Sequence, residues 1–301
     1  MITHEQKIRN YSYAKIFSMK GIMIQGTSSD SGKSFIVTGL CRLFSRKKFC
    51  ICPFKSQNMS NNFFITHDNL EMSTAQAVQA RAAGLRPEIF MNPILLKPRH
   101  ERSSEIILNG KKFEKRAEKN FYYENFTENE GINAVREALE YIKKNFDAII
   151  IEGAGSPAEI NLNEHEIVNM RIAREADVPV ILVADVDRGG SLASVVGTLE
   201  LLGHDRERVK GIIFNKFRGD INLFHSAVKF TEDYTGVKVL GVVPFAKNII
   251  LEAEDSLSEN FNKSIEKNSG EKIFLNDEAF DAIADLLEKN LDVNFLTELT
   301  F

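Results

Sequence analysis

The chain has 301 residues, of which 43% are hydrophobic and 27% are charged, and its formal net charge is −4. This composition excludes a disordered or fibrous chain and is ordinary for a soluble globular protein. The small negative charge argues against a nucleic-acid binder, and no apolar run reaches the ~18–20 residues of a membrane-spanning helix. The first residues also lack the apolar core of a secretory signal, so we expect a cytoplasmic protein with no membrane partner.

The chain starts with a segment that matches no element of the expected fold. Residues 1–20 are polar and precede the first predicted strand, so we interpret them as an N-terminal extension. Met19 lies just before that strand and is an alternative native start to Met1.

Short β-rich apolar runs then alternate with segments of helical spacing, a pattern typical of βαβ units around a parallel sheet. The strands are nearly continuous in Val, Ile and Leu, as expected when helices cover both faces of the sheet. The predicted strands are Ile22–Gln25, Cys50–Phe54, Ala148–Ile151, Val180–Ala184, Gly211–Asn215 and Val239–Val243. The predicted helices are Lys33–Lys47, Ser73–Ala83, Ile132–Asn145, Glu164–Glu175, Leu192–Leu202 and Leu223–Thr235.

Four further segments lie outside this alternation. Pro93–Asn109 is predicted to be extended chain, and the charged stretch Lys111–Glu130 to be a solvated helix and loop. Ser256–Lys272 is polar and lacks periodicity, which indicates a linker. Asp277–Asn290 has apolar residues at helical spacing and is predicted to close the fold against the sheet.

The three cysteines follow no metal-binding or redox pattern. Cys41 falls on a predicted helix, whereas Cys50 and Cys52 fall on a predicted strand. Without a CxxC pair or metal-ligand spacing, they are expected to be reduced thiols in the core.

A Gly- and Ser-rich turn joins the first predicted strand to the first predicted helix. Such a turn cradles phosphates, because glycines let the backbone N–H groups and the helix N-terminus face the anion. Lys33 is expected to reach the β and γ phosphates, and the Ser34 hydroxyl to bind Mg²⁺. Five residues, where the usual pattern has four, separate Gly26 from Gly32, and a turn without a ligand is the alternative. The predicted loop comprises Gly26, Thr27, Ser28, Ser29, Asp30, Ser31, Gly32, Lys33 and Ser34. The fold class is therefore predicted to be α/β, a P-loop NTPase-type parallel β-sheet with helices on both faces.

Polar side chains follow three other predicted strands, at the sheet edge where open α/β folds bind ligands. Glu152 is placed to hold magnesium directly or through water. Asp185 and Asp187 are candidates for outer magnesium contacts, for coupling to the γ phosphate, or for capping the next helix. The Asn215 amide can read the donor and acceptor edge of a purine.

In this order the motifs resemble the synthetase part of cobyric acid synthases, within the dethiobiotin synthetase-like group of P-loop enzymes. The resemblance covers about Gly21 to Asp255 and includes the phosphate-binding loop. The other matching stretches are Pro53–Met59 (PFKSQNM), Met91–Pro98 (MNPILLKP), Ile151–Leu162 (IEGAGSPAEINL), Val183–Gly190 (VADVDRGG), Asn215–Asp220 (NKFRGD) and Ala253–Asp255 (AED).

The resemblance, with the change in composition after Asp255, divides the chain into three parts. Residues 1–20 are the extension, and residues 21–255 are predicted to be the P-loop ATP-binding synthetase domain. Residues 256–301 are predicted to be a linker and a closing C-terminal helix.

The resemblance implies an ATP-dependent amide ligase of cobalamin biosynthesis, with ATP and Mg²⁺ as cofactors. ATP phosphorylates a peripheral carboxylate of a corrin ring of the cobyrinic acid a,c-diamide type, and ammonia then displaces the phosphate. The implied catalytic residues are Lys33, Lys55 and Glu152, and the implied metal ligands are Ser34, Glu152 and Glu71. The implied substrate contacts are Gln57, Asn58, Asp187 and Arg188, while Asn215 and Pro244 are assigned to the nucleotide.

The chain departs from the family at its C-terminal end. Full-length cobyric acid synthases continue into a glutaminase domain, and no cysteine here lies in the tight glycine-flanked turn of such a nucleophile. Ammonia from a separate glutaminase subunit, free ammonia, and a changed reaction are the three explanations. A homodimer is also expected, because many relatives place their sites near a subunit interface.

Two other functions compete with the corrinoid ligase. A dethiobiotin synthetase-like ligase would have a small site for a linear amino acid, and it does not require Gln57–Met59 or Ser156–Asn161. A regulatory P-loop ATPase of the partitioning type usually carries a second lysine early in the loop, where this chain has Thr27 and Ser28.

Overall fold

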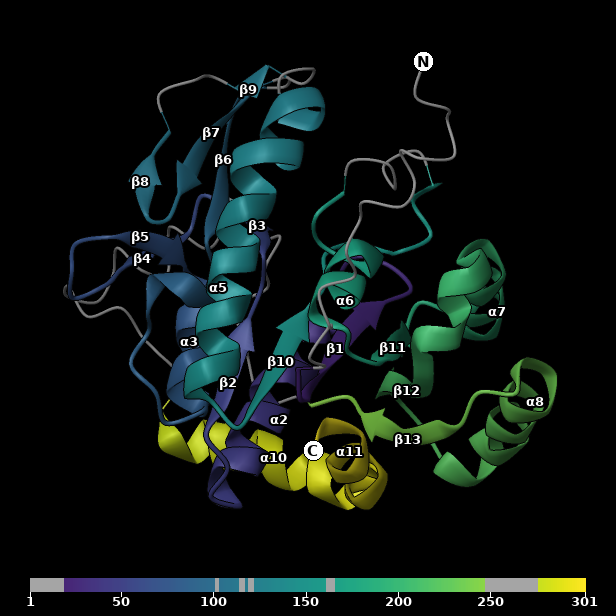
Figure 1. The fold of residues 1–301 in the computed structure, drawn as a ribbon. Coiled ribbons are helices and arrows are strands. Elements are labelled where there is room, and N and C mark those ends of the chain that lie inside the picture. Colours follow the sequence, from purple (N-terminus) through teal and green to yellow (C-terminus); the bar gives the residue numbers. More distant parts are fainter. Residues whose placement is uncertain (1–18, 101–102, 114–116, 119–121, 161–165, 247–275) are drawn as a thin grey trace, which may run out of the picture.

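The computed structural model describes residues 19–100, 103–113, 117–118, 122–160, 166–246 and 276–301. Within them, six parallel strands form a central sheet in the order β13-β12-β11-β1-β10-β2 (Figure 1). The strands are β1 (Gly21–Gly26), β2 (Ile51–Phe54), β10 (Ala148–Glu152), β11 (Val180–Asp185), β12 (Val209–Phe217) and β13 (Val239–Pro244). All six predicted strands and the parallel α/β class are confirmed.

Helices cover both faces of this sheet. Successive residues of a strand point to opposite sides, and apolar strand residues are buried on both of them. Ile22 and Ile24 of β1 belong to the apolar cluster on one face, and Met23 between them belongs to the cluster on the other. The helices on the first face are α2 (Lys33–Arg46), α10 (Asp277–Asn290) and α11 (Val293–Thr300). Those on the second face are α5 (Ile132–Asn145), α6 (Met170–Ala176), α7 (Ser191–Leu201) and α8 (His225–Thr235).

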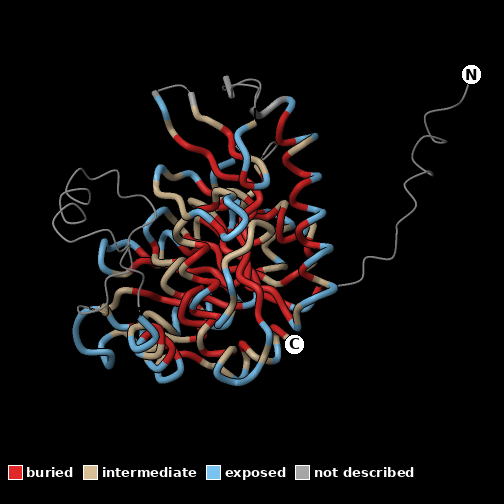
Figure 2. Tube along the Cα trace, turned by 90° about the vertical axis from the view of Figure 1, so that its left-hand side faces the viewer, coloured by how far each residue is buried: buried red, intermediate tan, exposed pale blue. Residues whose placement is uncertain are grey.

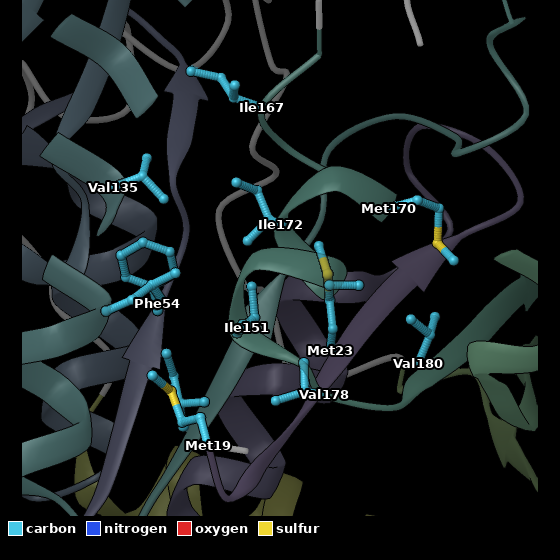
Figure 3. Packing of buried hydrophobic residues seen from close by; sticks show 14 of the residues in the cluster. Met19, Met23, Phe54, Val135, Ile151, Ile167, Met170, Ile172, Val178 and Val180 are labelled. Atoms are coloured by element: carbon cyan, nitrogen blue, oxygen red, sulfur yellow. The ribbon is translucent and has the colours of Figure 1, made fainter. Parts of the chain in front are cut away.

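The cluster on the second face ties together the strands whose ends carry the site. Met23 of β1 and Ile151 of β10 lie beside Ile172 of α6, while Phe54 of β2 points toward Val135 of α5 (Figure 3). All five side chains are fully buried. Burial of one such side chain contributes roughly 1.5–3 kcal/mol. Figure 2 shows the same division through the whole molecule, with buried chain inside and exposed chain along its outer surfaces.

A second, smaller sheet lies beyond the carboxyl end of β2 and beside α5 (Figure 1). Its strands are β3 (Gln57–Met59), β6 (Ile94–His100), β7 (Ser103–Leu108), β8 (Lys111–Lys112) and β9 (Ala117–Glu118). The segment predicted as extended chain forms the antiparallel pair β6-β7, and β3 pairs in parallel with β6. A separate hairpin, β4 (Phe63–Ile65) and β5 (Glu71–Ser73), leads into α3 (Thr74–Ala82).

Three expectations for individual segments need correction. Within the stretch Lys111–Glu130, the structure forms β8, β9 and the π-helical segment η3 (Tyr122–Gly131), because β7 offers a free edge for pairing. Helix α6 starts later than predicted, since the Glu166 carboxylate accepts the backbone N–H groups of Val168, Asn169 and Arg171 and holds that chain in a turn.

The third correction concerns the cysteines. Cys41 and Cys52 are buried as predicted, and burial raises the pKa of each thiol, so both stay protonated at neutral pH. Cys50 is exposed, because it precedes β2 and its backbone N–H is bound by Asp147.

The C-terminal chain packs on the first face of the sheet. Helix α10 forms at the residues predicted from their spacing, and Asn276 caps its start by accepting the Ala279 N–H with its side chain. Helix α11 was not predicted, although Asp292 caps it in the same way. The predicted linker and the Ala253–Asp255 motif lie outside the described residues, and the division into domains stays a prediction. No helix in the described parts of the chain is long and apolar enough to cross a membrane.

Gly39 sets how closely α2 and α10 approach. A Cβ at this position would lie 2.4 Å from Leu287 Cδ1 and 2.7 Å from Ile283 Cγ2. We expect Gly39→Leu to lower the free energy of unfolding by about 1–3 kcal/mol through overpacking, measured by urea denaturation. The control is Gly197→Ala in α7, where a Cβ meets nothing within 4 Å. An unchanged midpoint for Gly39→Leu would contradict this account of the helix packing.

Ion pairs reinforce the same contact, and one of them predicts a dependence on pH. Arg42 binds Asp281 with two parallel hydrogen bonds of 2.8 and 2.9 Å, and its hydrogen bonding lowers the pKa of that carboxyl from 3.8. A depressed folded-state pKa gives stability that is present above the unfolded value and lost as the pH falls through the folded one. Asp281→Asn should therefore destabilise the chain at pH 7, and its stability should converge with that of the parent as the pH falls through the lowered folded-state pKa of Asp281.

Urea denaturation across that pH range measures the convergence. The control is Asp233→Asn, which removes an exposed pair with Lys229 within α8. A parent-to-variant difference for Asp281→Asn that stays constant with pH would show that the pair contributes nothing through charge.

Candidate active site

The predicted phosphate-binding loop connects β1 to α2 as its sequence requires. Gly32 precedes α2 with φ of 93°, a left-handed conformation that costs glycine little. Gly26 is enclosed by the loop itself, since a Cβ there would lie 2.2 Å from Ser31 Oγ and 2.8 Å from the Ser28 carbonyl oxygen. Both glycines are thus needed by the backbone, and the N-terminus of the 14-residue α2 faces the position of an anion.

Glu152, the last residue of β10, is the centre of the site. Its Oε1 accepts hydrogen bonds from Ser34 Oγ and from Lys55 Nζ, each at 3.0 Å. Its Oε2 accepts a hydrogen bond from Gln79 Nε2 on α3. Three of the predicted residues, carried by α2, β10 and the chain after β2, therefore meet at one carboxylate.

Lys55 and Glu152 form a buried ion pair. The side chain of Lys55 is 2% exposed and that of Glu152 is fully buried. Two charges removed from water keep their ionised forms only with good geometry and additional hydrogen bonds. Ser34 and Gln79 supply such bonds to the carboxylate.

Lys33 links the loop to the turn after β10. Its side chain is buried, and Nζ donates to the carbonyl oxygens of Ser28 and Gly155 at 3.3 Å each. These carbonyl oxygens carry no net charge, so they orient the ammonium without cancelling its attraction for a phosphate.

The carboxyl end of β12 holds the other side of the loop. Asn215 is buried and donates to the Ser31 carbonyl oxygen at 3.0 Å, and a Cβ at Gly32 would lie 2.1 Å from its Nδ2. Lys216 has φ of 61° and donates to the Asp30 carbonyl oxygen and, at 2.9 Å, to Asp185 Oδ2. Asn215 thus supports the loop, and its role in reading a purine stays a prediction.

Asp187 and Arg188 lie in the turn after β11, beside the loop. Arg188 Nη2 binds Asp30 Oδ2 at 3.0 Å, and Asp187 Oδ1 accepts from Arg218 Nε at 2.7 Å. The alternative that Asp187 caps the next helix is wrong, because α7 begins after Gly190, which has no side chain. Their assignment as substrate contacts is untested by the structure.

The remaining predicted residues lie away from Glu152, in the small sheet, in the β4-β5 hairpin and at the end of β13. Asn58 is buried, and its amide donates to Ser73 Oγ at 2.5 Å and Gln76 Oε1 at 3.2 Å, so it links β3 to the start of α3, and its role as a substrate contact stays a prediction. Gln57 beside it on β3 is partly exposed. The Glu71 carboxylate pairs with Lys97 Nζ of β6, so its role as a metal ligand stays a prediction. Pro244 ends β13 and is exposed.

Three residues with notable contacts, Gln79, Lys216 and Lys97, were not predicted. Lys216 and Lys97 lie inside motifs that the resemblance had already marked, and Lys216 directly follows the assigned Asn215. Gln79 belongs to no such motif. Its only signal was its spacing of three residues from Gln76 on a predicted helix, which places two amides on one face.

The site fits Mg²⁺. Its oxygen donors are one hydroxyl, Ser34, and one carboxylate, Glu152, which are already 3.0 Å apart. In the described residues no three His, Cys, Asp or Glu side chains gather as a metal cage. Mg²⁺ needs no such cage, because it is usually bound by one or two carboxylates together with nucleotide phosphates and waters. The Gln79 Oε1 and Ser31 Oγ atoms are buried without a hydrogen-bond partner among these residues, which leaves acceptors for such waters.

A family model described as the CobQ/CobB/MinD/ParA nucleotide binding domain (CbiA) matches residues 22–258. The chain belongs to this family. It is also 50% identical over 246 residues to the cobyric acid synthase of Geobacillus kaustophilus, covering 81% of this chain and 48% of that protein. It is 49% identical over 243 residues to the probable cobyric acid synthase of Methanothermobacter thermautotrophicus, covering 80% and 48%.

The comparisons confirm the resemblance to one part of the cobyric acid synthases. The chain spans about half the length of the curated relatives it matches. Among solved structures, chloroplast FtsY from Physcomitrella patens aligns over 76% of this chain and 60% of its own, with 14% identity and a TM-score of 0.44. That similarity is too low to support a functional argument.

The buried pair predicts a strong coupling between its two residues. Lys55→Met leaves the Glu152 carboxylate without its counter-charge and should cost about 3–5 kcal/mol of unfolding free energy. The double variant Lys55→Met/Glu152→Gln should cost less than the sum of the single variants, measured by urea denaturation. Lys229→Met, at an exposed pair, is the control and should change little. Additive single effects would contradict a direct charge interaction.

Proposed function

We propose that this chain is an ATP-dependent amide ligase that activates a peripheral carboxylate of a corrinoid. The observation that carries the proposal is the meeting of Lys33, Ser34, Lys55 and Glu152 at the carboxyl edge of the sheet. The similarity to cobyric acid synthases supports the corrinoid as the substrate.

The proposed reaction has two steps. A substrate carboxylate oxygen attacks the γ phosphorus of ATP, the bond from that phosphorus to the bridging oxygen breaks, and an acyl phosphate and ADP result. Ammonia then attacks the acyl carbon, phosphate leaves, and loss of a proton gives the carboxamide. Phosphoryl transfer of this kind depends mainly on positioning and charge neutralisation.

The chain's own residues have distinct parts in this proposal. Lys33 binds the β and γ phosphates from its position over the loop, and Ser34 and Glu152 hold Mg²⁺, which neutralises charge on the phosphates. Lys55 lies directly after β2 and is held by Glu152, and from there it supplies positive charge for the substrate carboxylate that reacts. Asn215 keeps the loop in shape from β12.

Two sources of ammonia and one alternative reaction follow from this proposal. Ammonia comes either from a glutaminase or from solution. A dethiobiotin synthetase-like reaction would use the same phosphate and magnesium residues with a small diamine and CO₂, so the choice of acceptor is what distinguishes the two.

The test measures ADP release with Mg²⁺, ATP and cobyrinic acid a,c-diamide, in parallel with ammonium and with glutamine. We expect substrate-dependent release with ammonium and none with glutamine alone. Lys33→Met should lower that rate at least 100-fold, because it removes a charge that neutralises the transferred phosphoryl group. Tight ATP binding without corrinoid-dependent release from either nitrogen source would contradict the proposed substrate.

A further inference from the structure

Among the hydrogen bonds described above, the partner of Glu152 that belongs to no assigned motif is Gln79. It lies on α3, its side chain is fully buried, and its Nε2 donates to Glu152 Oε2. Ser34 and Lys55 bind the other carboxylate oxygen. Gln79 therefore helps to fix the rotation of the carboxylate, because it binds Oε2 while these bonds of Ser34 and Lys55 are made to Oε1.

Chemistry determines which way the Gln79 amide points. If oxygen and nitrogen were exchanged, a carbonyl oxygen would face the Glu152 carboxylate oxygen, and two acceptors would repel each other. With the nitrogen on Glu152, the carbonyl Oε1 is directed elsewhere. In the described part of the chain this buried oxygen has no hydrogen-bond donor.

A buried acceptor without a donor costs about 1–3 kcal/mol, so such an atom in a native fold calls for a ligand or a bound water. The proposed Mg²⁺ site can supply such a water, because Glu152 binds both Gln79 and the Ser34 hydroxyl. Mg²⁺ gives up its waters reluctantly and usually keeps several when it binds a nucleotide.

We propose that Gln79 is a positioning residue for this site: its N–H orients the Glu152 carboxylate, and its carbonyl oxygen accepts a hydrogen bond from a water on the nucleotide's Mg²⁺. The inference rests on the proposed function only in so far as Mg²⁺ and ATP bind here. A neutral amide suits this role, because a second carboxylate would compete with Glu152 for the Lys55 charge.

Gln76 provides a matched control from the same helix. It is also fully buried, and its Nε2 is likewise without an acceptor in the described residues. The Gln76 Oε1 accepts a hydrogen bond from Asn58 of β3 at 3.2 Å, so this bond is made to Asn58, whereas that of Gln79 is made to Glu152. Replacing either glutamine by methionine removes an amide group from a fully buried position of the same helix.

The experiment is a calorimetric titration of a non-hydrolysable ATP analogue into the full chain, with and without Mg²⁺. In the parent we expect Mg²⁺ to tighten binding. In Gln79→Met that tightening should shrink about 10–100-fold, the usual loss when an outer partner of a metal ligand is removed. Gln76→Met should keep the Mg²⁺ effect of the parent, and affinity without Mg²⁺ should be unchanged in both.

Thermal melting of each variant checks that it is folded, and Gln79→Ala replaces Gln79→Met if the latter is not. The proposal is overturned if the Gln79 variants keep the parent's Mg²⁺ effect, or if Gln76→Met loses as much. The measurement needs no corrinoid, so failure of the proposed substrate and failure of this inference are distinguishable. A lost Mg²⁺ effect in Gln79→Met, without any corrinoid-dependent turnover by the parent, would support the inference and overturn only the substrate.

Discussion

The ion pair between Lys55 and Glu152 is the interaction on which the rest of the site depends. Both side chains are almost completely removed from water, and their Nζ and Oε1 atoms are 3.0 Å apart. Because a buried charge is tolerated only with its partners in place, the pair depends on β10 and the chain after β2 and also on α2 and α3, which carry Ser34 and Gln79. The geometry of the site therefore depends on the correct packing of all these elements.

A second constraint acts on the phosphate-binding loop, which is also held by residues of β12. The order of the central sheet places β1 between β10 and β11, which is the switch point where such folds open a crevice for ligands. Asn215 and Lys216 reach the loop from β12, while Ser34 and Lys33 reach toward β10. The loop is thus held by hydrogen bonds from both halves of the sheet, and its backbone is arranged before a phosphate arrives.

Two additions surround this nucleotide-binding core. Lys55 lies between β2 of the central sheet and β3, the first strand of the small sheet. The position of Lys55 is therefore tied to both sheets. On the other face, α10 packs on α2 around Gly39 and is held by Arg42 and Asp281. Because α2 starts within the phosphate-binding loop, that packing also stabilises the helix whose N-terminus faces the anion.

The sequence alone determined the parallel sheet, its six strands and the phosphate-binding loop, because continuous apolar runs and glycine spacing are local signals. It also placed Glu152 at the sheet edge that carries the loop with Lys33 and Ser34, since carboxyl ends of parallel strands meet there, whereas Lys55 entered only through the resemblance. Only the tertiary structure decided that Gln79 binds Glu152, that Asn58 is a structural link, and that Glu71 pairs with Lys97. Those contacts join α3 and the small sheet to distant strands, and a polar side chain's partner depends on such packing rather than on its neighbours in sequence.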